Sequence, residues 1–201
     1  AAVFILSYPQ LYLFLLIMFL FVFVVIHELA HSIVARHYKI KVRKIVLYPI
    51  GGVSEIEEIP EKPSIEWRMA IAGPLTSFVI GGILLALDQV FLIEAPSAFI
   101  TPSLRTAGRF TLDLAYLNLI LGAFNLIPAF PMDGGRVFRA FLAEKMKFSD
   151  ATKYAAFIGR FFGIVMVMAG IFYNFWLIII GVFIYIGASE ETEQTIVSTT
   201  M

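Results

Sequence analysis

The segment that decides the fold runs from Gln10 to His37 and reads QLYLFLLIMFLFVFVVIHELAHSIVARH. Its first part, up to Ile26, contains no charged residue, and the segment is long enough to cross the hydrocarbon core of a bilayer, which is about 30 Å thick. We therefore predict a transmembrane helix here. The polar residues near its C-terminal end need an explanation, because a membrane helix rarely carries them.

Three of these polar residues, His27, Glu28 and His31, form the pattern H-E-x-x-H. Histidines four residues apart project from one face of a helix and can bind the same metal ion, while the glutamate can reach a water bound to that metal. A charged residue inside a membrane helix costs about 2.5–3.5 kcal/mol on insertion scales. Such a cluster therefore indicates a function, and a buried zinc ion would account for it.

The composition also indicates a membrane protein. Of the 201 residues, 60% are hydrophobic, and the mean hydropathy is +0.88. The 15 Lys and Arg residues balance the 15 Asp and Glu residues, so the net charge gives no indication of a nucleic acid partner. The chain has no cysteine, which excludes disulfides and thiolate metal sites. A metal here must be bound by histidine, carboxylate or water.

We predict a polytopic membrane protein of the all-α class with about five to six transmembrane helices. Further apolar segments predict helices over about 65–91, over 111–127 and over 151–188, the last broken near Gly170 or Tyr173-Asn174. An amphipathic helix is expected over 136–147. Alternating residues from Lys39 to Tyr48 predict a short membrane-associated β segment after the H-E-x-x-H helix, followed by a turn over 49–53 and an acidic loop over 55–63.

The basic residues predict the orientation of the helices. Lys and Arg gather between Arg36 and Arg68 and again between Arg136 and Lys153, whereas the segment between helices 65–91 and 111–127 holds only Arg105 and Arg109. By the positive-inside rule, the C-terminal ends of helices 10–37 and 111–127 face the cytoplasm. His31 then lies about 7–8 Å, and His27 about 13–14 Å, inward of Arg36. The motif is expected to be buried near the cytoplasmic face.

A catalytic zinc ion usually has three protein ligands, so the two histidines need a third partner. Asp133 is the best candidate, because it follows helix 111–127 on the same side of the membrane. It stands in the segment Pro128-Ala129-Phe130-Pro131-Met132-Asp133-Gly134-Gly135, which cannot stay a regular helix. Irregular backbone at membrane depth is tolerated where protein buries it or where it lines a watery cavity. Asn125, two turns before Asp133, adds a polar amide to this region.

These motifs resemble those of the site-2 protease family of intramembrane zinc metalloproteases. The chain has its H-E-x-x-H at 27–31 and its N-x-x-P-x-x-x-x-D-G at 125–134, and the order of Gly51-Gly52 and Ala72-Gly73-Pro74 is similar. The resemblance covers about residues 10–188 and is greatest to archaeal and bacterial members without a PDZ domain. It implies one Zn²⁺ per chain bound by His27, His31 and Asp133, with Glu28 as the general base. It also implies that Asn125 positions the substrate or stabilises the oxyanion.

The resemblance implies a multi-pass protein of the cell membrane that hydrolyses peptide bonds within or near transmembrane segments of membrane-protein substrates. No nucleic acid partner is expected, and the oligomeric state is not indicated. Residues 1–188 are expected to form the metalloprotease core, with residues 1–8 as the end of a truncated first transmembrane helix. Residues 189–201 are expected to form a cytoplasmic tail that could begin a regulatory domain.

Three alternatives stay open at this point. A prenyl-protein protease would use a glutamate as third ligand, and no later helix offers an obvious one. A metal or ion transporter could use the His/Asp site for transit, and it would keep its activity without Glu28. A scaffold with an inactive site is disfavoured, because every expected catalytic residue is present.

Other polar residues are interpreted as structural. We expect His37 to lie at the membrane interface. Asp88, Asp113 and Arg160 are expected to be structural rather than to form an ion path, because the two aspartates lie near helix ends and Arg160 can pair or snorkel. The segment from Lys39 to Tyr48 suggests a further hypothesis. Its strand could bind an unwound substrate segment by strand addition.

Overall fold

The computed structural model describes residues 9–40, 42–48, 51–56, 62–93 and 102–200. The expected end of a first transmembrane helix, residues 1–8, lies outside these ranges. The described residues form six helices and one hairpin: α2 (Pro9–His37), β1 (Val42–Tyr48), β2 (Gly51–Ile56), α3 (Pro63–Ile93), α4 (Pro102–Asn125), α5 (Asp133–Ala143), α6 (Phe148–Tyr173) and α7 (Phe175–Thr200).

Among the described residues, four helical segments are long and apolar enough to cross a membrane: Gln10–His37, Pro63–Gln89, Phe148–Tyr173 and Phe175–Glu193. Helix α4 has 24 residues, but its N-terminal half carries Arg105, Arg109 and Asp113. The predicted helical membrane fold is therefore confirmed in its class. The count of five to six spans stays a prediction.

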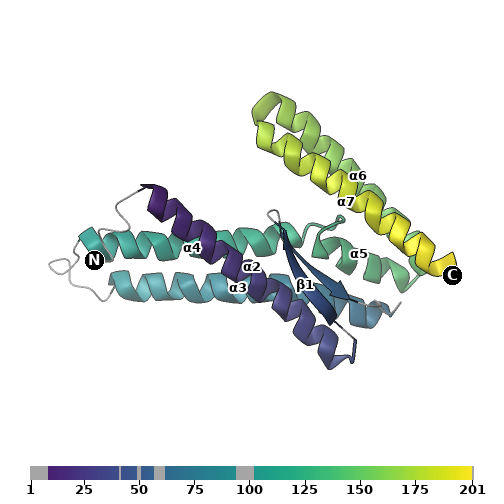
Figure 1. Cartoon of the computed structure of the whole chain (residues 1–201), viewed down its shortest axis with the longest axis horizontal. Coiled ribbons are helices and arrows are strands. Elements are labelled where there is room, and N and C mark those ends of the chain that lie inside the picture. Colours follow the sequence, from purple (N-terminus) through teal and green to yellow (C-terminus); the bar gives the residue numbers. More distant parts are fainter. Residues whose placement is uncertain (1–8, 41, 49–50, 57–61, 94–101, 201) are drawn as a thin grey trace.

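The helices form two groups that meet near α5 (Figure 1). In the first group, α3 and α4 pack side by side and α2 crosses them. In the second, α6 and α7 form an antiparallel hairpin that diverges from the first group and joins it through α5. Small residues allow the close packing of α6 on α7, since a Cβ added to Gly163 would lie 2.7 Å from the Gly181 carbonyl oxygen.

The β-hairpin follows α2 and packs against it. Strand β1 occupies most of the segment that the alternating pattern indicated, and it pairs antiparallel with β2, with Ile45 opposite Ser54 and Val46 opposite Val53. The expected turn over 49–53 was too long, because β2 already begins at Gly51. Glu55 was expected in the acidic loop but belongs to β2. Pro49 and Ile50 lie outside the described residues.

Two helix boundaries differ from the prediction by nine residues or more, each for its own physical reason. Helix α4 begins at Pro102, nine residues before the expected start, because proline is well tolerated in the first turn of a helix. Helix α7 continues to Thr200, although a polar tail was expected from Ser189. The tail lacks Gly and Pro and is rich in Glu, a good helix former, and polarity alone does not end a helix. The break between α6 and α7 lies at Asn174, one of the predicted positions.

Candidate metal centre

His27 and His31 lie one turn apart on α2, and both side chains are buried. Their imidazole rings meet edge to face with centroids 5.0 Å apart. The Nε2 atom of each ring lies 3.2 Å from the same carboxylate oxygen, Oδ2 of Asp133. The structure thus brings together the three residues that the sequence selected, over a separation of more than 100 positions.

The spacing of these three atoms suits a zinc ion. Tetrahedral nitrogen and oxygen ligands that lie about 2.0–2.1 Å from zinc are about 3.3 Å apart from one another, close to the 3.2 Å between Asp133 Oδ2 and each Nε2. In addition, the Nε2 atom of His31 is buried and makes no well-directed hydrogen bond within the described part of the chain. A buried ring nitrogen with this surrounding is suited to bind a metal.

The other nitrogen of each imidazole is held by a hydrogen bond. His31 Nδ1 lies 2.7 Å from the backbone oxygen of Met69, and His27 Nδ1 lies 2.9 Å from the Ser77 hydroxyl oxygen. A carbonyl oxygen only accepts, so Nδ1 of His31 carries a proton, and in the neutral imidazole, the form that binds a metal, Nε2 then presents its lone pair. Metal-binding histidines are typically oriented by such a second partner, which fixes both the tautomer and the ring direction.

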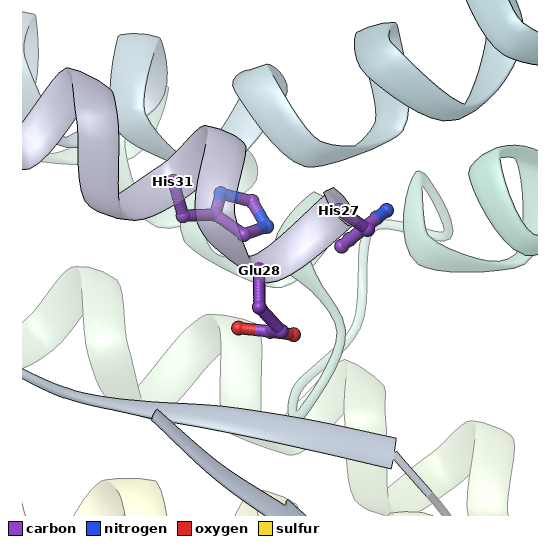
Figure 2. A group of neighbouring side chains, drawn as sticks. All are labelled: His27, Glu28 and His31. Carbon is purple, nitrogen blue, oxygen red and sulfur yellow. The ribbon is translucent and has the colours of Figure 1, made fainter. Parts of the chain in front are cut away.

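Glu28 extends from the same helix beside the two histidines, and its carboxylate points toward the β-hairpin (Figure 2). One ligand atom from each of His27, Glu28 and His31 lies within 4.8 Å of the others. Asp133 also approaches both imidazoles, so two carboxylates, those of Glu28 and Asp133, lie beside the two histidines. A carboxylate that lies there without binding the metal can exchange protons with a water held at the site.

Gly73 of α3 gives the two imidazoles their space. A Cβ atom added to Gly73 would lie 2.2 Å from His31 Nε2 and 2.5 Å from His27 Nε2, far inside van der Waals contact. Any side chain at this position would therefore displace the nitrogens that face Asp133. Glycine is needed at position 73 for the close approach of α3 to the imidazoles of α2.

Asp133 is the first residue of α5, after the irregular segment that follows α4. This segment is anchored in the protein, with Ala129, Phe130 and Met132 buried. Burial by itself would raise the pKa of Asp133, but the charges and hydrogen bonds of His31 and His27 outweigh it and hold the pKa below its ordinary value. The carboxylate is thus deprotonated at neutral pH, as metal binding requires.

Asn125, the fifth predicted site residue, ends α4. Its Nδ2 donates a hydrogen bond to the backbone oxygen of Leu121, one turn earlier in the helix. Its part in substrate binding stays a prediction. Elsewhere, Asp113 accepts a hydrogen bond from Tyr12, at 2.6 Å, and the side chain of Asp88 is buried in α3.

Two partners of the histidines, the Ser77 hydroxyl and the Met69 carbonyl, were not predicted from the sequence. Ser77 carried a usable signal, because it is a polar residue in an apolar helix one turn after Gly73. The Met69 carbonyl carried none, since every residue has one.

The model of peptidase family M50 matches residues 15–111 and 102–166. The zinc metalloprotease MJ0392 of Methanocaldococcus jannaschii is 46% identical over 177 residues, which are 88% of this chain and 49% of that protein. The putative zinc metalloprotease Rip3 of Mycobacterium tuberculosis is 36% identical over 186 residues, covering 86% of this chain and 44% of its own length.

The fold is also similar to a solved structure, the site-2 protease from Methanocaldococcus jannaschii. The TM-score is 0.70 at 44% identity, covering 92% of this chain and 79% of the solved chain. The chain spans about half the length of the curated relatives that it matches.

We predict that Gly73→Ala weakens zinc binding by at least tenfold, because the new methyl group would displace both Nε2 atoms. The measurement is the zinc content of detergent-purified protein after dialysis against a chelator. Gly82→Ala is the matched control, since it lies in the same helix and an added Cβ would meet nothing within 4 Å. Equal zinc retention by both variants would contradict the assigned role of Gly73.

We predict that Ser77→Ala weakens zinc binding about 10- to 100-fold, as is typical when the second partner of a metal-binding histidine is lost. Thr76→Val is the control, because the Thr76 hydroxyl donates within its own helix to the Ala72 carbonyl. A competition titration with a zinc-binding dye measures both affinities. If Ser77→Ala and wild type had the same affinity, the hydrogen bond to His27 would not orient a ligand.

Proposed function

The chain belongs to peptidase family M50, the site-2 protease family, and we propose that it is an intramembrane zinc endopeptidase. It hydrolyses peptide bonds within or near transmembrane segments of other membrane proteins. The observation that carries this proposal is the meeting of His27 Nε2, His31 Nε2 and Asp133 Oδ2, beside Glu28, on helices that can cross a membrane.

His27, His31 and Asp133 would hold one zinc ion. When bound, zinc lowers the pKa of a water toward 7 and polarises a carbonyl group. Hydrolysis then requires the protein to move protons at the right atoms. Glu28 accepts the proton of the attacking water as the new C–O bond forms, and it returns a proton to the leaving nitrogen as the C–N bond breaks.

The position of Asn125 at the end of α4, eight residues before Asp133, supports a role in holding the substrate. Its side-chain amide can rotate away from the Leu121 carbonyl and donate to a substrate carbonyl or to the oxyanion. The basic residues after α2 and α5 support an orientation with the site near the cytoplasmic face of the cell membrane. Water reaches the site from that face.

The β-hairpin is suited to present the substrate. A peptide bond in a helix is shielded by its own hydrogen bonds, so a substrate helix must unwind locally before it is cut. An unwound segment can pair with the edge of a strand. The Glu28 carboxylate points toward the hairpin (Figure 2), so a segment bound there would lie on the side of the general base.

We predict that Glu28→Gln lowers the rate of cleavage about 10²- to 10⁴-fold without loss of zinc. Glutamine keeps the size of the side chain but cannot accept a proton at this position. The measurement is product formation from a single-span membrane peptide in detergent, together with zinc content. The transporter would be favoured instead by two results together: the wild type cleaves no peptide, and both the wild type and Glu28→Gln carry zinc into liposomes.

We predict that Ile45→Pro or Val46→Pro slows cleavage of a membrane-embedded peptide. Adjacent residues of a strand direct their N–H groups to opposite edges, so one of the two prolines removes a donor from the free edge of β1. Circular dichroism shows whether each variant stays folded. If both variants stayed folded and cleaved at the wild-type rate, substrate strand addition at β1 would be wrong.

A further inference from the structure

A group of four charges, two of them buried, lies outside the metal centre and joins three helices near it. The four members are Glu66 of α3, Arg136 and Arg139 of α5, and Glu191 of α7. We call it the charge cluster. Arg139 Nε donates to Glu66 Oε1 at 2.7 Å, and Arg139 Nη2 pairs with the same oxygen. Arg139 Nη1 lies 3.3 Å from Glu191 Oε1, and Arg136 Nη2 lies 3.7 Å from Glu191 Oε2.

Arg139 lies at the centre of the charge cluster, where carboxylates and aromatic rings contact its guanidinium. It is among the largest fully buried side chains of the described residues, with 2% of its surface exposed. Its guanidinium lies 4.9 Å from the ring centre of Phe130 and 4.7 Å from that of Phe148. Phe130 is completely buried and belongs to the segment that leads to Asp133. The arginine therefore contacts both that segment and α3.

The two arginines of the charge cluster follow Asp133 in α5 at helical spacing. Arg136 and Arg139 lie three and six residues after Asp133 in α5, so the three side chains project from neighbouring positions on consecutive turns. A shift of α5 along or about its axis that broke the pairs with Glu66 and Glu191 would also move the Asp133 carboxylate. The ion pairs and the metal ligand share one rigid helix.

The α6–α7 hairpin also holds the segment in front of Asp133. Ile184 of α7 packs with the buried Ala129 and Met132, while Ala155, Ala156 and Ala188 enclose Phe130. A Cβ added to Gly187 of α7 would lie 2.7 Å from Pro131 Cγ, so α7 closely approaches this segment. The α6–α7 hairpin thus contacts the chain on both sides of Asp133 in the sequence. Apolar packing holds the segment before it, and the ion pairs of Glu191 hold α5 after it.

We infer that Glu191 and Arg139 are positioning residues for Asp133, so that the α6–α7 hairpin sets the zinc affinity of the site through the charge cluster. This inference rests on the proposed zinc site. Ligand geometry must be held to about 0.5 Å for a productive site. α2 provides its two histidines from one rigid helix, whereas Asp133 depends on α5 and on whatever holds α5. Glu66 holds it from α3, and Glu191 holds it from α7.

A purely structural role predicts something different. An ion pair that only supports the fold would stabilise the protein equally with and without zinc. If the ion pair positions a metal ligand, its loss also lowers the affinity for zinc. Zinc binding then adds less stability to the folded state, because the added stability depends on that affinity. The increase in Tm on adding zinc therefore separates the two roles.

The test is Glu191→Gln, which removes the charge that faces both arginines but keeps the size of the side chain. Glu193→Gln is the matched control, because Glu193 lies two residues further in α7 and its side chain is exposed. We expect Glu191→Gln to release zinc about tenfold faster into a chelator and to lose part of the zinc-induced rise in Tm. Glu193→Gln should behave as wild type. Zinc release from Glu191→Gln at the wild-type rate would overturn the inference.

A second variant keeps the inference testable if Glu191→Gln fails to fold. Gly187→Ala pushes α7 against Pro131, and we expect faster zinc release and a smaller zinc-induced rise in Tm than in wild type, whatever the Tm of the zinc-free protein. An unchanged release rate would count against the inference. Only the metal is used as probe, so a wild type that binds zinc without cleaving peptides would contradict the proposed function and not this inference.

Discussion

The approach of two imidazole nitrogens to one carboxylate oxygen is the constraint on which the rest of the structure depends. The three groups come from α2 and α5, far apart in the chain, and they meet where burial makes any unpaired charge costly. Most of the unusual features of the chain serve this meeting. Gly73 leaves room for the rings, Ser77 and the Met69 carbonyl fix their direction, and the irregular segment after α4 brings Asp133 to them.

The same constraint explains why a chain with so apolar a composition has fully buried charges elsewhere. A short helix such as α5, with 11 residues, has little stability of its own and takes its position from its neighbours. Apolar contacts alone allow small shifts, whereas Arg139 directs two N–H groups at one oxygen of Glu66 and a third toward Glu191, which admits few orientations. The charge cluster thus gives α5 a defined position between α3 and the α6–α7 hairpin, and Asp133 shares that position.

Much of this arrangement could be predicted from local sequence, but the second partners could not. The apolar run before His27 and the spacing of H-E-x-x-H predicted α2 and its metal face, and Asp133 followed from the Pro- and Gly-rich break after α4. Glu191 had no such signal. In the sequence it is one of several glutamates in a polar stretch, and its pairing with α5 follows from packing that no local pattern reports. The start of α4 at Pro102 and the extension of α7 to Thr200 were missed because hydropathy marks the part of a helix that suits lipid, while propensity and capping decide where it ends.

X-ray absorption at the zinc edge, on the purified protein and on Asp133→Ala, is the decisive test of a zinc site built from His27, His31 and Asp133. We expect about one zinc per chain with two imidazole nitrogens and oxygen ligands, all at about 2.0–2.1 Å, and loss of an oxygen ligand or of the metal itself in the variant. A folded protein that takes up no zinc when metal is offered would contradict this site. So would a zinc spectrum that is the same with and without Asp133.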